Sequence, residues 1–201
     1  MNPYIVVKEF EKELSKYTGA PYVVCVDSST DALFLCCYRS EVDMVTIPKH
    51  TYLSVPMSII HSGGKVEFED LEWSGIYQLK PYPIWDSAKR MKKDMYINGS
   101  YMTLSFHMTK HIPIGKGGAI LCDNKDDYEW FKKARYEGRT DGLNYHDDDI
   151  EFCGWNMYMT PQEAIRGMEL LSGLPDDNED LVEYPPYRDL TTFKVFKKGK
   201  I

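Results

Sequence analysis

The stretch TLSFHMTKHIPIGKGGAI, at residues 103–120, constrains the fold of this chain more than any other. A short apolar run leads into a polar turn that holds Lys110, three glycines follow, and a second apolar run closes the stretch. This pattern predicts two strands joined by a loop that contains the lysine. Glycines let a backbone take positive φ or approach a neighbour closely. A lysine in such a partly dry loop can become a nucleophilic amine, although from local pattern alone a surface lysine in a hairpin is the simpler interpretation.

Strand-like and helix-like segments alternate along the rest of the chain. Apolar strand-like runs lie at residues 22–26, 44–47, 65–68 and 83–86, and helical periodicity is found at residues 6–17, 31–38, 52–61, 125–135 and 164–171. Alternation of this kind is typical of an α/β fold. We therefore predict a mostly parallel central sheet with helices on both faces over residues 1–174, followed by a short C-terminal tail or arm at residues 175–201.

Composition and charge argue against several classes of function. A net charge of −7 argues against broad nucleic-acid binding. No stretch approaches the roughly 20 apolar residues of a membrane helix. The N-terminus lacks the apolar core of a signal peptide, so we expect a cytoplasmic protein. The five cysteines are odd in number and lack metal-ligand spacing. We interpret them as buried, reduced thiols and expect no metal site.

A candidate anion site follows the strand-like run at residues 22–26. Asp27, Ser28, Ser29 and Thr30 come directly after this run and before the next predicted helix. Hydroxyl side chains suit a helix N-cap, and the N–H groups of a first helical turn, together with the helix dipole, bind anions. On its own, an ordinary helix cap is the better interpretation of this segment.

Separated blocks of sequence change that balance, because their residues and order resemble those of the DegT/DnrJ/EryC1/StrS sugar aminotransferases. These are pyridoxal-phosphate (PLP) enzymes of fold type I. The blocks are VVCVDSSTDAL from residue 23, KHTYLSVP from residue 49, PIWDSAK from residue 83, SFHMTKHIPIGKGGAIL from residue 105 and CGWNMYMTPQ from residue 153. The resemblance covers about residues 4–174, with gaps. It implies that residues 1–174 form the PLP-binding large domain of such an enzyme, and that the family's second domain is largely missing.

The resemblance implies two catalytic residues. Lys110 would form a Schiff base with the cofactor and then move a proton at the substrate carbon. Asp86 would pair with the pyridine nitrogen and keep it protonated, so that the ring withdraws electrons from the substrate. On its own, an aspartate at a strand end is usually a turn former.

The same resemblance implies a wider set of cofactor contacts. Tyr52 would stack on the pyridine ring, with plain core packing as its alternative role. Asn156 would reach across a two-fold interface to the phosphate bound by the neighbouring subunit. The full predicted set is Ser29 and Thr30 at the phosphate, together with Tyr52, Asp86, Lys89, Ser105, Lys110 and Asn156.

Several features depart from the family pattern. Lys89 stands where the family usually has Gln or His, Lys116 replaces a Glu, and Tyr158 replaces an Arg. The interval from Tyr52 to Asp86 is also shorter than usual. This short interval predicts that the sheet has lost one strand–helix unit.

A run of basic residues, KRMKK at residues 89–93, stands out in this acidic chain. A solvated face is the usual explanation of a short charge run. The functional alternative is a patch that attracts a diphosphate-bearing substrate.

Two main hypotheses follow for the function. In the first, the chain is a PLP-dependent aminotransferase of polysaccharide biosynthesis that moves an amino group, expected from glutamate, to a keto sugar nucleotide. It would act as a homodimer with composite active sites, without nucleic-acid or membrane partners. In the second, it is a non-catalytic or regulatory relative that binds PLP and dimerises but does not transaminate. A structural fragment without a cofactor is a third option.

Overall fold

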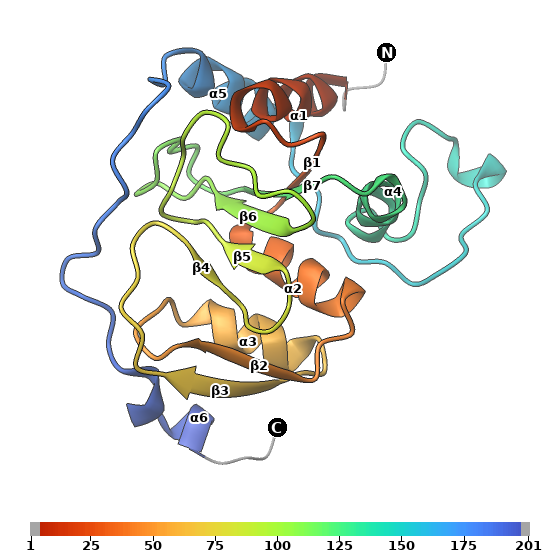
Figure 1. Cartoon of the computed structure of the whole chain (residues 1–201). Helices are drawn as coiled ribbons and strands as arrows, with labels where there is room; N and C mark the ends of the chain where they lie inside the picture. Colours follow the sequence, from red (N-terminus) through yellow and green to blue (C-terminus); the bar gives the residue numbers. More distant parts are fainter. Residues whose placement is uncertain (1–4, 198–201) are drawn as a thin grey trace.

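The computed structural model describes residues 5–197; residues 1–4 and 198–201, at the outer ends of the two predicted regions, lie outside the described part. Figure 1 shows a five-stranded sheet in the middle of the molecule and a two-stranded sheet below it. The larger sheet has the strand order β1 (Tyr22–Val26), β7 (Gly118–Cys122), β6 (Tyr101–Ser105), β5 (Ile84–Asp86) and β4 (Tyr77–Gln78). The smaller sheet pairs β2 (Met44–Pro48) in parallel with β3 (Lys65–Glu69).

Helices cover both faces of the larger sheet, as predicted. One face packs against α1 (Ile5–Thr18) and α5 (Pro161–Ser172), and the other packs against α2 (Ser29–Arg39) and α4 (Lys125–Ala134). A further helix, α3 (Ser54–His61), lies against α2 and β3. Shorter helical segments are η1 (Tyr145–Asp147), η2 (Leu190–Thr192) and α6 (Lys194–Lys197). Among residues 5–197, none of the helices combines the length and apolarity needed to cross a bilayer.

The strand β1 shows how the sequence produces these two layers. Val23 and Cys25 join the apolar cluster under α1 and α5, whereas Val24 and Val26 join the cluster under α2 and α4. Successive side chains of a strand point to opposite faces of the sheet, so a strand covered on both faces is apolar throughout. The uninterrupted run YVVCV is therefore the expected sequence for a strand in the middle layer.

The sheet is mixed, not mostly parallel as predicted. Within the five-stranded sheet β5 and β6 pair in parallel, whereas β1–β7, β6–β7 and β4–β5 are antiparallel. The connections 79–83 and 106–117 contain no helix and return the chain directly beside the strand it has just left, which gives antiparallel pairs. Apolar runs identify strands but do not reveal their direction.

The segment between α3 and α4 contains strands and no helix within the described part of the chain. The smaller sheet is joined to the segment after β4 through Thr46 and Lys80, whose backbones exchange hydrogen bonds of 2.8 and 3.1 Å. The predicted loss of one strand–helix unit stays a prediction. The helix predicted at residues 52–61 begins at Ser54, with Pro56 in its first turn, where the missing N–H of proline is tolerated.

The cysteines differ from the prediction at one position. Cys25, Cys36, Cys37 and Cys122 are buried in the two apolar clusters as free thiols, but Cys153 is exposed. Cys153 lies outside the regular elements, in the segment between η1 and α5.

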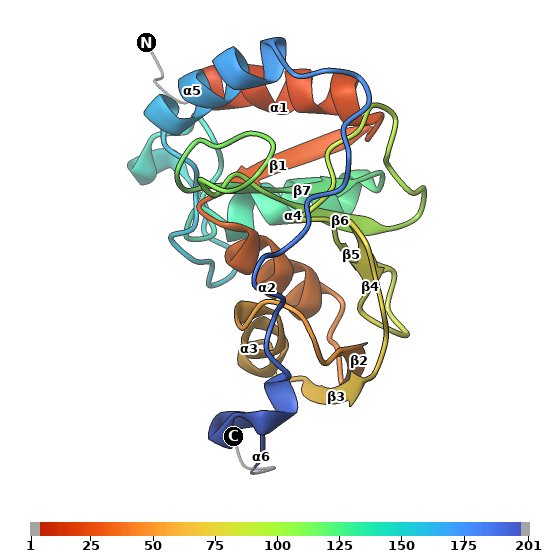
Figure 2. The ribbon, with the colours of Figure 1, turned by 90° about the vertical axis from the view of Figure 1, so that its left-hand side faces the viewer.

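After α5 the chain turns back along the molecule. Figure 2 shows this segment, in blue, running from α5 past the five-stranded sheet toward β3, where α6 lies. Residues 175–189, called the arm below, contain no helix or strand. Individual side-chain and backbone contacts, rather than a regular element, therefore hold the arm in place. The division of the chain at residue 174 into a domain and an arm stays a prediction.

Candidate active site

Three strands of the larger sheet run in the same direction and end at the same edge. Because β7 is antiparallel to both β1 and β6, and β5 is parallel to β6, the strands β1, β5 and β6 share one direction. Ser29 and Thr30 follow β1, Asp86 ends β5 and Ser105 ends β6. Ligands of α/β proteins bind at the carboxyl ends of such strands. The fold therefore explains why these predicted site residues meet.

A cavity of about 290 Å³ opens at this edge. The first turns of α2 and α3, the end of β5, the loop 106–117 and the arm form its wall. Seven of the eight predicted cofactor contacts line it, namely Ser29, Thr30, Tyr52, Asp86, Lys89, Ser105 and Lys110.

Close contact between two backbones holds the lysine loop against the start of α2. A Cβ atom at Gly118 would lie 2.4 Å from both the carbonyl carbon of Ser28 and the nitrogen of Ser29. The preceding Gly117 has a φ of +130°, a conformation that other residues rarely adopt. These glycines of the 103–120 stretch therefore have a structural explanation.

The start of α2 has the features of an anion site. The Ser28 side chain caps the helix by accepting a hydrogen bond from the N–H of Asp31 (3.1 Å). Thr30 Oγ1 donates to Ser54 Oγ (2.9 Å). The hydroxyl of Ser29, by contrast, is buried without a hydrogen-bond partner among residues 5–197. Because an unsatisfied buried hydroxyl costs about 1–3 kcal/mol, an anion bound here would relieve that cost, which fits the phosphate of the predicted cofactor.

Lys110 lies in the loop between β6 and β7, as predicted. Burial lowers the pKa of its amine, and the ammonium of Lys89 adds to this effect, whereas the carboxylates of Asp86 and Glu183 oppose it. More of the amine is therefore unprotonated near neutral pH than in an ordinary lysine. This favours a nucleophilic lysine over the alternative of a surface lysine.

Asp86 is buried and held at both carboxylate oxygens. Tyr77 Oη donates to Oδ2 (2.8 Å), and the N–H of Ala88 donates to Oδ1 (3.0 Å). Burial raises the pKa of Asp86. A carboxyl that is fixed in this way, with a raised pKa, is suited to sharing a proton with a ring nitrogen. Sequence analysis missed Tyr77, because the two-residue strand β4 gives no periodic signal.

The arm contributes two residues to the cavity wall that sequence analysis also missed. Glu183 Oε2 lies 2.8 Å from Lys89 Nζ, and this nitrogen lies 4.7 Å from the centroid of the Tyr187 ring. Both arm residues line the cavity. The acidic composition of the arm and the basic run at residues 89–93 were visible in the sequence. These opposite charges could have predicted a contact between the arm and the basic run.

Tyr52 stands at the mouth of the cavity. Tyr52 is 58% exposed, which excludes plain core packing as its role in this chain. Its ring centroid lies 6.3 Å from that of Tyr187. The stacking role of Tyr52 stays a prediction.

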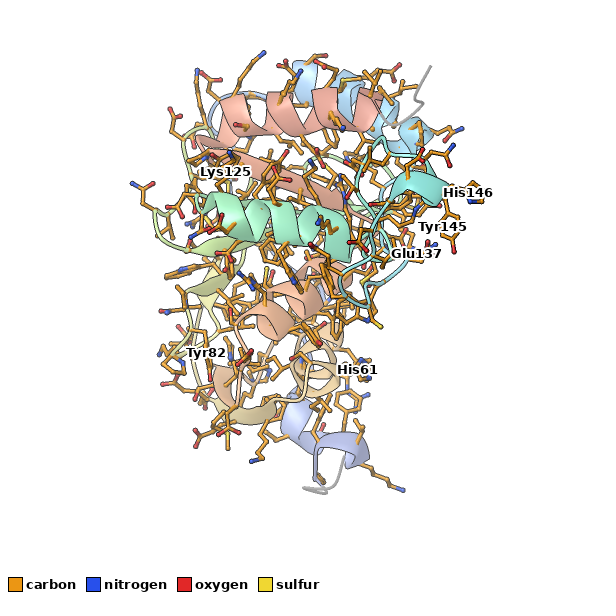
Figure 3. All side chains as sticks on the ribbon, turned by 90° about the vertical axis from the view of Figure 1, so that its right-hand side faces the viewer. His61, Tyr82, Lys125, Glu137, Tyr145 and His146 are labelled. Carbon is orange, nitrogen blue, oxygen red and sulfur yellow. The ribbon has the colours of Figure 1, made fainter. Side chains whose placement is uncertain are left out.

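Asn156 does not line this cavity. Its Nδ2 donates to Glu137 Oε1 (3.1 Å), and Figure 3 shows Glu137 just beyond the end of α4. The predicted role placed Asn156 at the phosphate of a neighbouring subunit, so its position in a single chain leaves that prediction untested. Tyr158, which stands in the place of the family's Arg, packs edge-on against Tyr136 with ring centroids 5.3 Å apart.

Comparisons with known proteins point to one family. The model of the DegT/DnrJ/EryC1/StrS aminotransferase family matches residues 2–84 and 92–181. The spore coat polysaccharide biosynthesis protein SpsC of Bacillus subtilis (strain 168) is 36% identical over 85% of this chain and 57% of its own length. A UDP-4-amino-4,6-dideoxy-N-acetyl-beta-L-altrosamine transaminase of Campylobacter jejuni is 22% identical over 96% of this chain and 62% of its own length.

The chain is thus similar to part of each relative. Its alignment with the transaminase extends over 240 residues, more than the 201 residues of the chain, so that relative contains internal residues that this chain lacks. Among solved structures, 3-amino-5-hydroxybenzoic acid (AHBA) synthase superposes with a TM-score of 0.71 at 19% identity, over 84% of this chain and 56% of that one. At such low identity the likeness shows the fold alone, which is that of the PLP-dependent aminotransferases.

Proposed function

We infer that the cavity is the active site of a sugar aminotransferase, because this chain belongs to the DegT/DnrJ/EryC1/StrS aminotransferase family. Membership of the family implies PLP as the cofactor. The names of two relatives, a polysaccharide biosynthesis protein and an amino-sugar transaminase, support a sugar nucleotide as the acceptor. One observation carries the proposal. At one cavity there meet a lysine with a lowered pKa, a buried carboxyl and, at a helix start, a hydroxyl without a partner in the described part of the chain.

The residues of the cavity fit the chemical groups of this cofactor. Ser29, Thr30 and the first N–H groups of α2 would hold its phosphate. Tyr52 offers an aromatic face at the mouth, and Asp86 would hold a proton on the ring nitrogen. When bound, the cofactor supplies an electron sink for the negative charge that develops at the substrate carbon.

Lys110 would carry the proton transfers. Because burial lowers its pKa, its amine would hold the cofactor, and it would take a proton from the substrate carbon and return it. Asp86 would keep its orientation throughout, since Tyr77 and the backbone of Ala88 hold it. Ser105 lines the same wall and completes the proposed set within this chain.

The proposal includes glutamate as the amino donor, a keto sugar nucleotide as the acceptor, and a homodimer in which Asn156 completes the partner's site. Apolar side chains exposed beside the cavity support a covering partner. Met108, on the lysine loop, is 72% exposed, and Tyr52 and Leu53, just before α3, are also exposed. Sedimentation of the PLP-loaded protein tests this part, since a monomer that retains its cofactor would contradict it.

A non-catalytic or regulatory relative is the second candidate function. The observation that favours it is the ion pair between Lys89 and Glu183 in the cavity wall, at the position where the family uses Gln or His to contact the ring hydroxyl. Such a protein would bind PLP at Lys110 and dimerise without transferring an amino group.

Loading with PLP, followed by glutamate, separates these candidates. The loaded protein is reduced with borohydride and digested, and mass spectrometry locates the modified lysine. We expect modification at Lys110 and its loss in Lys110→Ala. Lys116→Ala is the matched control, because that lysine lines the same cavity but is paired with Asp27.

Absorbance of the cofactor is then followed as glutamate and a keto sugar nucleotide are added in turn. A change with glutamate that the sugar reverses supports the aminotransferase. Modification at Lys110 without any response to glutamate supports the second candidate. Equal modification of the wild type and Lys110→Ala contradicts both.

A further inference from the structure

The basic run at residues 89–93 and the arm are fastened to each other along their lengths. Ion pairs join Lys89 to Glu183, Arg90 to Asp180, Lys92 to Asp177 and Lys93 to Asp176. The residue numbers of the acidic partners fall as those of the basic residues rise, so the two segments run antiparallel. Two backbone hydrogen bonds fix the same register, from Leu181 N to Lys89 O (2.9 Å) and from Lys93 N to Asp176 O (2.8 Å).

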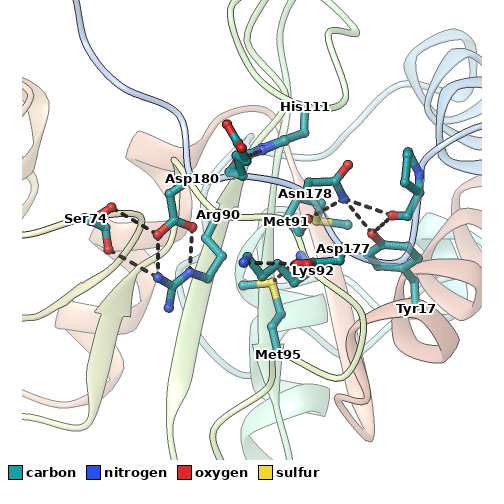
Figure 4. Close-up of polar contacts among 12 residues, drawn as sticks. Tyr17, Ser74, Arg90, Met91, Lys92, Met95, His111, Asp177, Asn178 and Asp180 are labelled. Carbon is teal, nitrogen blue, oxygen red and sulfur yellow. Dashed lines mark hydrogen bonds and ion pairs between the residues drawn. The ribbon is translucent and has the colours of Figure 1, made fainter.

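The middle of this contact is the most fully bonded part (Figure 4). Arg90 Nε donates to Asp180 Oδ1 (2.8 Å) and Arg90 Nη2 donates to Oδ2, which also accepts from Ser74 Oγ (3.1 Å). Asn178 Nδ2 donates to the backbone oxygen of Met91 (2.7 Å). Such two-pronged arginine contacts fix geometry as well as charge. The basic run is therefore a docking site for the arm, neither a freely solvated face nor an open patch for a diphosphate.

The docked arm brings Glu183 to the buried end of the run. The side chain of Lys89 is 6% exposed, and a buried ammonium requires a counter-charge. Glu183 supplies it at 2.8 Å, and the ring of Tyr187 lies under the same ammonium. We propose that Glu183 is a positioning residue of the active site: it holds Lys89 against Tyr187, neutralises its charge, and so fixes the electrostatic field at Lys110. The proposal rests on the proposed function only in taking Lys110 as the reactive amine.

The charges around Lys110 predict in which direction the loss of Glu183 should shift the pKa of Lys110. Burial lowers the pKa of Lys110 most and Asp86 opposes it, whereas Lys89 lowers this pKa further and Glu183 opposes Lys89. Although burial alone would raise the pKa of Glu183, hydrogen bonds from Lys89 and Tyr187 hold it below its ordinary value, so Glu183 is a carboxylate at neutral pH. Without that charge, the lowering effect of Lys89 on the pKa of Lys110 would still be opposed by Asp86 but no longer by Glu183. The titratable groups that line the cavity with Lys110 are Asp86, Lys89, His107, Lys116, Glu183, Tyr52 and Tyr187.

Competitive labelling of lysines measures this effect without any cofactor. The protein is acetylated with trace acetic anhydride at a series of pH values, and mass spectrometry gives the midpoint of the Lys110 reaction. Glu183→Gln keeps the size of the side chain and an oxygen for Lys89 but removes the charge. We expect the midpoint of the Lys110 reaction to move to lower pH. Asp177→Asn is the matched control, because it removes the same charge from an arm residue that is 88% exposed and outside the cavity.

The direction of the shift separates this role from a merely structural one. If Glu183 only fastened the arm, its loss would admit water, reduce the burial of Lys110 and move the midpoint to higher pH. A shift to higher pH, no shift, or an equal shift in Asp177→Asn overturns the proposal. Glu183→Asp, which keeps the charge, should restore most of the wild-type midpoint. If the protein fails to bind PLP, the proposed function is overturned, but the labelling midpoint of Lys110 can still be measured because that experiment uses no cofactor.

Discussion

The core beneath α1 and the surface beneath the arm use the same kind of ion pair in different ways. In the core, Arg135 pairs with Glu11, and their side chains are 4% and 6% exposed. The same Glu11 accepts a hydrogen bond from the N–H of Cys25 (2.8 Å), and Arg135 donates to the Cys25 carbonyl oxygen. This pair joins α1, β1 and the end of α4, which apolar packing already holds together.

On the surface, the ion pairs of the arm have no regular element to support them. The arm is placed by its contacts with the run at residues 89–93, and several of these side chains face solvent. The cavity therefore has two kinds of wall. Ser29, Asp86 and Lys110 are positioned by the sheet, whereas Glu183 and Tyr187 belong to the arm, which ion pairs hold to the run at residues 89–93. From this difference we expect one part of the site to be insensitive to salt and the other part to respond to it.

The largest effect is expected in the core. Glu11→Ala leaves Arg135 buried with the more distant Asp141 (3.6 Å) as its counter-charge. Removing one partner of a buried ion pair typically costs about 3–5 kcal/mol of unfolding free energy. Denaturant unfolding monitored by circular dichroism measures it. The control is Glu13→Ala on the same helix, whose pair with Lys16 is exposed and should matter little. Equal losses of unfolding free energy in the two variants would contradict the proposed difference between buried and exposed ion pairs.

A smaller change in stability, whose direction follows from the pKa of Asp86, is expected in the part of the cavity wall that the sheet positions. Burial raises the pKa of Asp86 above its ordinary 3.8, so the folded protein binds this proton more tightly than the unfolded chain does. The resulting stabilisation is present below the unfolded pKa and is lost as pH rises through the folded pKa. Asp86→Asn should therefore be at least as stable as the wild type at pH 7, with a flatter decline in stability above pH 4.

Thermal unfolding across this pH range measures the change at Asp86, and retention of PLP is recorded on the same samples. We expect weaker retention together with unchanged or higher stability. A variant that loses stability at pH 7 would show that Asp86 is held for the fold rather than for the site.

The smallest effect is expected at the arm. Raising the salt concentration from about 0.1 M to about 1 M shortens the screening length from about 10 Å to about 3 Å. The backbone amides of Leu181 and Lys93, which bond across the arm contact, should then exchange hydrogen several-fold faster. The amide of Cys25, which bonds to Glu11 in the core, serves as the internal reference. Faster exchange at all three amides would mean that salt loosens the whole fold and not the arm.

The sequence predicts the parts of the molecule that local apolar pattern determines. The strand at Tyr22–Val26 has the predicted bounds, and the helices predicted at residues 6–17 and 125–135 match α1 and α4 to within one residue at each end. The meeting of Ser29, Asp86 and Lys110 at one cavity also follows the sequence-based expectation. The roles assigned to these residues and to Asn156 stay predictions.

The remaining features depend on contacts between distant segments. The direction of β4 and β7 is set by how their connections return, and an apolar run carries no such information. The arm has no apolar period, and its central pair joins residues 90 positions apart. Acidic and basic runs suggest attraction, but they do not specify register. Glu183 and Tyr187 could therefore be placed in the cavity only from the structure.

The backbone contact between Gly118 and Ser28 sets a fixed spacing for whatever the cavity holds. The lysine loop and the start of α2 touch here through main-chain atoms, with no side chain between them that could change its rotamer. We therefore expect the separation between the end of the lysine loop, where β7 begins, and Ser29 to change little when side chains elsewhere repack. A ligand must match this length at both of its ends at once. Discrimination by ligand length then resides in the main chain, while the mouth and the arm remain able to vary with the rest of the ligand.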